Sequence, residues 1–129
     1  MAPEILEGQP CQGQVVDLFA LGVILFILYA GHQPFKLANN DDSYYKQLAC
    51  PRPVNFWNAH ENLRFGNSYS DEFKNLITWM LQYAPYQRLG SADIIGHPWL
   101  ARGYVARTDQ VRNEICLRNL QIKENLIDE

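Results

Sequence analysis

Histidine, cysteine and serine are the side chains of this sequence with the chemistry to bind a metal or attack a substrate. The candidates are His32, His60, His97, Cys11, Cys50, Cys116 and Ser70. Zinc sites usually combine close pairs of such ligands, as in CxxC. Here the cysteines are widely spaced, and the histidines have no carboxylate or cysteine at ligand spacing. The sequence therefore predicts no metal site.

Covalent catalysis is not indicated either. A nucleophilic serine or cysteine needs a general base close by. Neither Cys11 nor Ser70 has an evident base partner, and Ser70 precedes Asp71 and Glu72 as a helix N-cap would. We therefore assign Cys11 and Ser70 structural rather than catalytic roles.

The composition limits the class of protein. Of the 129 residues, 47% are apolar and 19% are charged, and the formal net charge is -3. These values are typical of one soluble globular unit and exclude disordered, collagen-like and disulfide-scaffold chains. Eleven basic residues scattered among 14 acidic ones offer no cationic face for nucleic acid. With no secretion signal and an odd number of cysteines, we expect a cytoplasmic protein with reduced thiols.

One long apolar segment must form the centre of the fold. Residues 18–35 carry no full charge, and residues 18–31 are almost wholly apolar. A membrane span needs about 20 apolar residues, and His32, Gln33 and Pro34 end this run too early. We therefore predict a helix over residues 15–30 that is apolar on every side and surrounded by protein, rather than a membrane span.

The other patterns are also helical, so the fold class expected is all-α. Residues 31–40 read as a loop, residues 41–49 as a helix, and Phe56, Trp57 and His60 have helical spacing. Residues 70–82 form the clearest helix, and Ser91 is expected to cap a short helix ending near residue 95.

The last segment, from Thr108 onward, is predicted to be a helix that packs against the preceding helices. Its apolar residues form two seams: Val111, Ile115, Ile122 and Leu126, and more weakly Cys116, Leu120 and Ile127. A calmodulin-binding tail would need a basic amphipathic helix. Acidic residues outnumber basic ones here, which argues against calmodulin.

Five short motifs occur in a fixed order. They are Ala2-Pro3-Glu4, Asp17-Leu18-Phe19-Ala20-Leu21-Gly22, Gly31-His32-Gln33-Pro34-Phe35, Pro85-Tyr86-Gln87-Arg88-Leu89 and Gly96-His97-Pro98-Trp99. In this order they resemble the second half of a eukaryotic protein kinase, most of all serine/threonine kinases of the calcium/calmodulin-dependent group, although Phe19 stands where many members have Trp. The resemblance implies a helical fragment of the large lobe over residues 1–103, followed by a helical extension over residues 104–129.

The resemblance also implies structural roles for four residues. Glu4 should pair with Arg88 in a buried carboxylate-guanidinium bridge, for which the planar fork of Arg is suited. Asp17 should accept backbone N–H groups of a catalytic loop and so orient catalytic residues. A simpler interpretation makes Asp17 a first-turn acid stabilised by the helix dipole. Gly22 is the last residue of the motif that begins the central helix.

The groups that would perform phosphoryl transfer are missing from the sequence. There is no GxGxxG, VAIK-like, His-Arg-Asp or Asp-Phe-Gly segment, and these supply the phosphate, magnesium and base contacts of a kinase. We therefore expect no catalytic, cofactor or metal residue in this chain, with MgATP bound only by the complete parent. Met1 is expected to be an internal methionine of a truncated kinase. The alternative is a non-catalytic, kinase-derived interaction module.

Several residues could contact protein substrates or regulators. The candidates for such contacts are Pro34, Phe35, Tyr44, Tyr45 and Trp57. The resemblance implies that this aromatic-rich region lies beside the substrate groove of the kinase. Aromatic anchors are frequent at interfaces. Ordinary core packing is the alternative.

Overall fold

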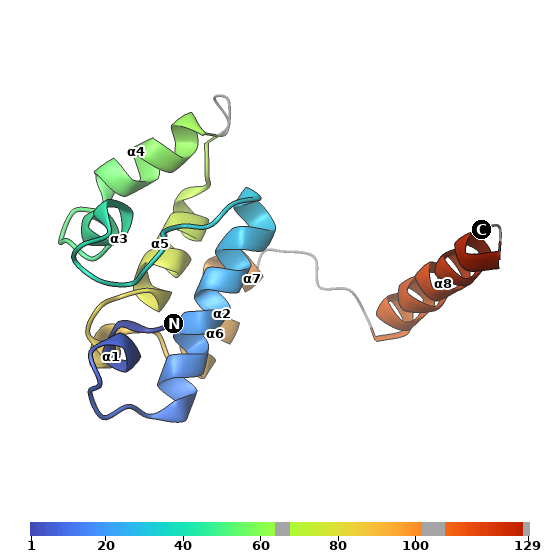
Figure 1. The fold of residues 1–129 in the computed structure, drawn as a ribbon, viewed down its shortest axis with the longest axis horizontal. Helices are drawn as coiled ribbons and strands as arrows, with labels where there is room; N and C mark the ends of the chain where they lie inside the picture. Colours follow the sequence, from blue (N-terminus) through green and yellow to red (C-terminus); the bar gives the residue numbers. More distant parts are fainter. Residues whose placement is uncertain (64–67, 102–107, 128–129) are drawn as a thin grey trace.

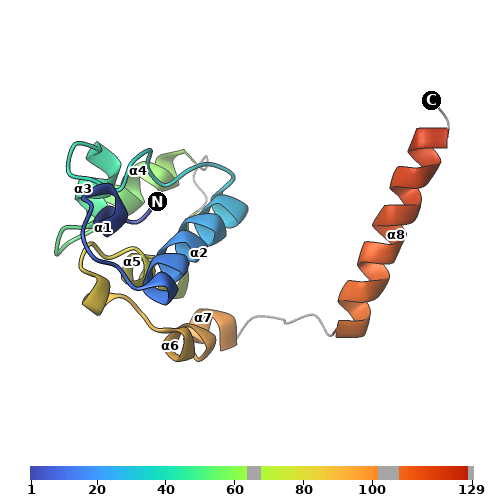
Figure 2. The same cartoon turned by 60° about the horizontal axis from the view of Figure 1, so that its bottom comes forward.

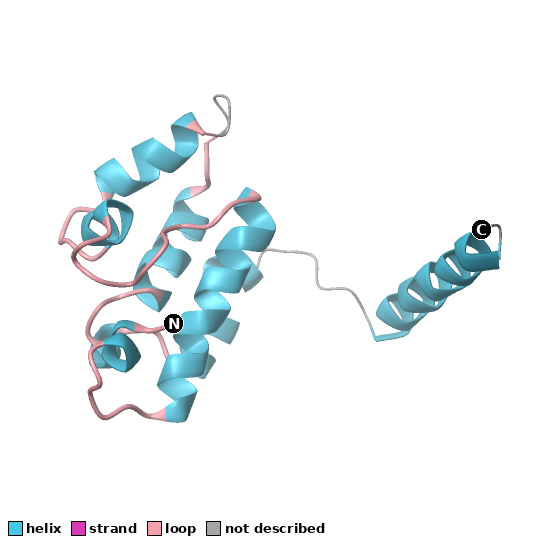
Figure 3. Ribbon diagram, viewed as in Figure 1, coloured by secondary structure: helices cyan, strands magenta, loops and turns pink. Residues whose placement is uncertain are grey.

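The computed structural model describes residues 1–63, 68–101 and 108–127. These residues form helices and turns, without a strand among them (Figure 3). The helices in chain order are α1 (Pro3–Leu6), α2 (Gly13–Ala30), α3 (Ser43–Leu48), α4 (Val54–Asn62), α5 (Asp71–Met80), the 3-10 helix η1 (Pro85–Gln87), α6 (Ser91–Ile95), α7 (Pro98–Ala101) and α8 (Thr108–Ile127). The expected all-α fold is confirmed.

Helices α2 and α5 pack against each other at the centre (Figure 1). Helix α3 packs on α4, while α7 contacts both α5 and α6. The fully buried side chains of this core are mostly aromatic or branched: Phe19, Phe26, Tyr45, Leu48, Phe56, Phe73, Leu76, Ile77, Met80 and Leu81. One continuous core therefore joins elements from both sides of α2 and α5.

The ends of the helices follow local chemistry. The Ser70 side chain accepts a hydrogen bond from the Phe73 amide at 3.2 Å, as an N-cap does. Gly31 ends α2 with φ of 83°, a left-handed conformation that favours glycine. At α6 the expected cap is wrong: Gly90 occupies the N-cap position and Ser91 is the first helical residue.

Helix α2 is less enclosed than its sequence suggested. Its buried residues are Phe19, Gly22 and Phe26, which face the core, whereas Leu21, Ile24, Ile27 and Leu28 are exposed. The prediction that protein surrounds this helix on every side is therefore wrong for the described chain, because only one of its faces has a neighbour. By length and composition α2 could cross a membrane, with a mean hydropathy of 2.0; core helices of soluble proteins meet the same criterion.

Helix α8 forms where the sequence predicted it, but not in the predicted place. Figures 1 and 2 show it standing apart from the other helices. Its apolar residues are exposed, including Val111, Ile115, Leu120, Ile122 and Leu126. The prediction that α8 packs against the preceding helices is wrong in this structure, since its two apolar seams are too weak to specify one contact face.

Candidate functional site

Helix α1 and the segment after η1 bring Glu4 and Arg88 together. Pro3 occupies the first turn of α1 and Glu4 follows it, while Arg88 immediately follows η1. Arg88 Nη1 donates to Glu4 Oε1 at 2.6 Å, and Nη2 donates to Glu4 Oε2 at 2.7 Å. Both side chains are almost completely buried, with exposures of 1% for Arg88 and 6% for Glu4. The pair is thus a buried, bidentate ion pair.

The remaining groups of the Arg88 guanidinium are also occupied. Nε donates to the Gln82 carbonyl at 2.7 Å, and Nη2 donates to the Tyr83 carbonyl at 3.1 Å. The guanidinium carbon lies 4.7 Å from the centre of the Phe19 ring, within cation–π range. The hydrogen bond from Arg88 lowers the pKa of Glu4, although burial acts in the opposite direction. A buried charge with this many partners is compatible with the interior.

A second contact joins the same two segments at the surface. The Tyr83 hydroxyl donates to Glu7 Oε1, and this hydrogen bond raises the pKa of Tyr83. Sequence reasoning missed the contact because 76 residues separate the partners. It could have been found only by placing Arg88 first, since Tyr83 lies shortly before it in the chain and its carbonyl accepts from Arg88.

Gly22 lies in close contact with the end of α5. A Cβ atom added there would lie 3.0 Å from both Met80 Cβ and Leu81 Cδ2. Such a distance is shorter than an ordinary carbon contact. Glycine at this position therefore permits the two central helices to pack tightly.

Asp17 does not lie in the first turn of its helix. Its side chain is exposed, and it lies beyond the first turn of α2, which contains no acidic residue. The first-turn interpretation is therefore wrong. The catalytic-loop interpretation stays a prediction.

Of the five docking candidates, four lie inside the core. Pro34, Phe35, Tyr45 and Trp57 are buried, and Tyr44 alone among them is exposed, at 40%. Phe35 and Tyr45 pack edge to face with ring centres 4.8 Å apart. Burial raises the pKa of Tyr45, whose hydroxyl donates to the Leu81 carbonyl at 3.4 Å. Tyr44 is thus the most exposed of the five, Trp57 also lines an open groove, and docking by these residues stays a prediction.

Asp42 fixes the loop beside these residues. Its Oδ1 accepts hydrogen bonds from the Tyr44 and Tyr45 amides, and its Oδ2 accepts from the Lys36 and Leu37 amides at 2.8 and 3.0 Å. Burial raises the pKa of this carboxyl, but the four backbone hydrogen bonds outweigh it and the net pKa is lowered. Asp42 therefore connects the loop after α2 to the start of α3.

Two histidines that are far apart in sequence meet in this region. His32 Nε2 lies 2.8 Å from His60 Nδ1, and His60 Nε2 lies 2.9 Å from the Pro34 carbonyl oxygen. Burial is the main cause that lowers the pKa of His60 to about 4. No sequence signal pointed to this pair, because 28 residues and a loop separate its members.

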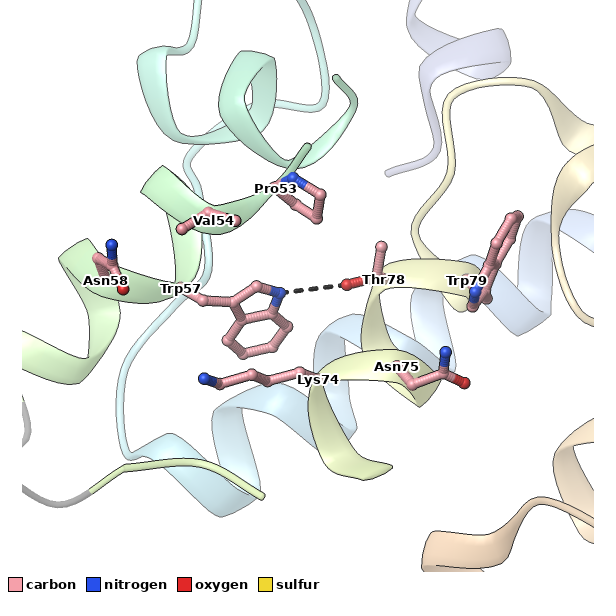
Figure 4. A pocket seen from close by; sticks show the side chains of 8 residues that line it. All are labelled: Pro53, Val54, Trp57, Asn58, Lys74, Asn75, Thr78 and Trp79. Atoms are coloured by element: carbon pink, nitrogen blue, oxygen red, sulfur yellow. Dashed lines mark hydrogen bonds between the residues drawn. The ribbon is translucent and has the colours of Figure 1, made fainter. Parts of the chain in front are cut away.

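An open groove of about 320 Å³ lies between α4 and α5 (Figure 4). Its walls come from the start of α4 and one face of α5: Pro53, Val54, Trp57, Asn58, Lys74, Asn75, Thr78 and Trp79. The Trp57 indole donates to the Thr78 hydroxyl at 3.1 Å and forms part of the groove. Lys74 pairs with Glu61 at 2.5 Å on the rim. The surface that lines the groove is mainly apolar.

The structure shows no cluster of three or more His, Cys, Asp or Glu side chains over residues 1–63, 68–101 and 108–127. The ordered features are instead a buried ion pair, a tight glycine contact and an aromatic core. All of them join segments that lie far apart in sequence.

Comparison with known proteins identifies this arrangement. The family model for the protein kinase domain matches residues 1–100. The chain belongs to the protein kinase family. The matched range contains Glu4, Gly22 and Arg88, so the ion pair and the tight helix contact both lie within the kinase domain.

Curated relatives of this kinase chain are themselves kinases or kinase-like proteins. It is 38% identical over 99 residues to the SNF-related serine/threonine-protein kinase of Homo sapiens, covering 77% of this chain and 12% of that protein. It is 31% identical over 128 residues to the CaM kinase-like vesicle-associated protein of Danio rerio, covering 97% of this chain and 28% of that protein. The kinase chain thus spans less than a third of these relatives' length.

A solved structure supports the same fold. The twitchin kinase region from C. elegans matches with a TM-score of 0.56 and 27% identity, covering 91% of this chain and 21% of that one. The helical part of the kinase fold therefore describes the arrangement of α1 to α7, and the predicted resemblance to the family is confirmed.

Proposed function

We propose that this chain forms the helical part of a serine/threonine kinase domain whose complete form transfers phosphate from MgATP to protein hydroxyl groups. The buried pair of Glu4 and Arg88 carries the proposal. It joins α1 to the segment after η1, within the range that the kinase family model matches. Curated relatives named as serine/threonine kinases support the choice of acceptor.

The pair has a structural role in this proposal. It holds the segment around Glu4 against the helical lobe, so that in the complete kinase the residues that recognise substrate stand in a fixed place. Asp17, exposed on α2, would orient catalytic residues by accepting their backbone N–H groups. Gly22 sets the spacing of the two central helices. None of these residues reacts with substrate.

The chain by itself is proposed to be inactive and to bind no cofactor. A kinase holds MgATP through a Gly-rich loop, a strand Lys and a DFG Asp, and the 129-residue sequence contains none of these motifs. MgATP would be bound by the complete parent only. The partners expected for the lobe are protein substrates or regulators, and the location expected is the cytoplasm. We interpret α2 as a lobe helix rather than a membrane span because the family model includes it.

Isothermal titration of the chain with MgATP tests this proposal. The expected result is no saturable heat of binding, with a complete serine/threonine kinase domain as positive control. Saturable micromolar binding to residues 1–129 would contradict the proposal, because it would require phosphate-binding groups that the motifs do not reveal.

A non-catalytic interaction module is the second candidate. The observation that favours it is the apolar groove between α4 and α5, where Val54 and Trp79 are exposed (Figure 4). A module would fold as a stable monomer without a catalytic parent. The association state of the isolated chain therefore discriminates between the two candidates.

A further inference from the structure

Helix α8 is exposed along its described length. Residues 111–126 are exposed throughout, and Figures 1 and 2 show α8 apart from helices α1 to α7. Without packing, even alanine-rich helices of about 12–15 residues are only marginally stable in water. The 20 residues of α8 include three asparagines and no alanine, a composition of low helix propensity. Helix α8 therefore requires a surface that covers it.

One side of α8 carries an apolar stripe. Because an α-helix has 3.6 residues per turn, four exposed apolar residues fall within about 60° of one another around its axis: Val111, Ile115, Ile122 and Leu126. An amphipathic helix that binds in a groove presents a stripe of this kind. On a flat surface so narrow a stripe specifies a contact poorly, whereas a groove encloses it from two sides.

The groove between α4 and α5 has the properties that such a stripe requires (Figure 4). It has a volume of about 320 Å³ and a mainly apolar lining, with exposed Val54 from α4 and exposed Trp79 from α5. Among the described residues that line it, Lys74 is the charged one, and it is paired with Glu61 at 2.5 Å. An apolar stripe that enters the groove therefore buries no unpaired charge.

A second copy of the chain supplies both parts of this contact. Helix α8 stands apart from the helices that form the groove (Figure 2), so the stripe and the groove of one chain do not meet. When α8 of each copy enters the groove of the other, the two contacts are related by a two-fold axis and the assembly closes as a dimer. The outer face of α2 is also exposed, but a single helix surface covers the stripe from one side only.

We propose that the groove between α4 and α5 binds α8 of a second copy of this chain, and that two copies exchange their α8 helices reciprocally. The stripe of α8 lies against Val54 and Trp79 in the dimer. Because docking stabilises the helical form of α8, dimer formation and helix content rise together. The contact goes beyond the proposed kinase function, since it involves neither Glu4 nor Arg88.

Light scattering after size-exclusion chromatography tests the exchange on the full chain. Leu28→Lys serves as the reference chain, because the exposed outer face of α2 would otherwise add its own association. A reducing agent prevents cross-linking through the exposed Cys11 and Cys116. We expect the reference chain to reach twice the mass of one chain as its concentration rises from micromolar to submillimolar. Far-UV circular dichroism should show helix content increasing over the same range.

Two substitutions in the reference chain block the two surfaces separately. Val54→Lys places a charge in the groove and Ile122→Lys places one in the stripe, so each variant should be a monomer. The matched controls are Ile95→Lys, at an exposed position of α6, and Asn113→Lys, on the opposite side of α8 from the stripe. Both controls should remain dimeric. Near-UV circular dichroism shows whether the helices around the groove stay folded, because α8 contains no aromatic residue.

Mixing the two monomeric variants identifies the contact. Val54→Lys retains the stripe and Ile122→Lys retains the groove, so the mixture should form a dimer through the one remaining contact, at a higher concentration than the reference chain needs. A Val54→Lys chain that stays dimeric while Ile122→Lys is monomeric would overturn the proposal, because α8 would then pair with α8. A reference chain that is monomeric at every concentration, or an Ile122→Lys chain that stays dimeric, would overturn it as well.

Discussion

The two faces of α2 have similar apolar composition but different environments. Phe19, Gly22 and Phe26 recur at helical spacing and are buried in the core that α2 shares with α5. On the opposite face, Ile24 and Leu28 are 53% and 78% exposed. Hydrophobicity alone therefore does not decide which side of a helix is buried. A neighbouring element must also be present to cover it.

The inner face of α2 also contacts a charged group whose hydrogen bonds are satisfied. Arg88 lies over Phe19 while it pairs with Glu4, so a charged group is accommodated inside an aromatic core. The outer face offers water mainly apolar surface, which contributes about 25 cal/mol per Å² to any contact that hides it. The inner face should therefore respond to mutation through stability, and the outer face through association.

The largest effect expected is at the buried ion pair. Arg88→Ala leaves the Glu4 carboxylate buried without its partner, which should lower the free energy of unfolding by about 3–5 kcal/mol. Urea denaturation followed by circular dichroism measures the change. Arg118→Ala is the matched control, because it breaks the exposed Arg118–Glu114 pair and should cost less than about 1 kcal/mol. Equal losses in the two variants would contradict the special position of the inner face.

Gly22→Ala should have the next largest effect. The added methyl group would lie 3.0 Å from Met80 and Leu81 atoms, and overpacking of this kind typically costs about 1–3 kcal/mol. The better helix propensity of alanine offsets roughly 1 kcal/mol of this cost. Gly13→Ala in the same helix has open space around the new atom and should not destabilise. A Gly22→Ala variant as stable as Gly13→Ala would show that α2 and α5 pack less tightly than described.

A smaller effect should appear on acidification. Because Arg88 lowers the pKa of Glu4 in the folded chain, the charged pair stabilises folding above the unfolded value near pH 4.5, and this stability is lost as the pH falls through the folded pKa. Glu4→Gln lacks this titration. The gap in unfolding free energy between wild type and Glu4→Gln should therefore narrow below pH 4.5 in urea titrations. A gap that stays constant down to pH 3 would refute this account of Glu4.

The smallest effect on stability, but a visible one on association, is expected at the outer face. Residues 1–129 should self-associate and bind a hydrophobic dye on size-exclusion chromatography. Leu28→Lys should reduce both signals while changing the unfolding free energy by no more than about 0.5 kcal/mol. Tyr86→Lys, which removes an exposed aromatic side chain beside the start of α2 rather than on its outer face, should leave association unchanged. A monodisperse wild-type monomer that leaves the dye dark would favour the interaction module.

Most helices could be predicted because their signals are local. The Ser70 cap, the apolar period of α5 and the glycine after α2 act over a few residues, and the predicted ranges differ from the observed ones by a few positions. Helices α1, η1 and α7 were not predicted, because each is only three or four residues long. The family was also readable, since five motifs in fixed order constrain the chain more than any one of them does.

The sequence by itself determined the helical class, the kinase family and some helix ends, such as the Ser70 cap. Only the tertiary structure decided which face of α2 is covered, that α8 stands apart, and that His32 meets His60. The physical reason is the range of the interactions. Caps and helical periods act within one or two turns of a chain, whereas burial and side-chain pairing depend on surfaces that come from distant segments.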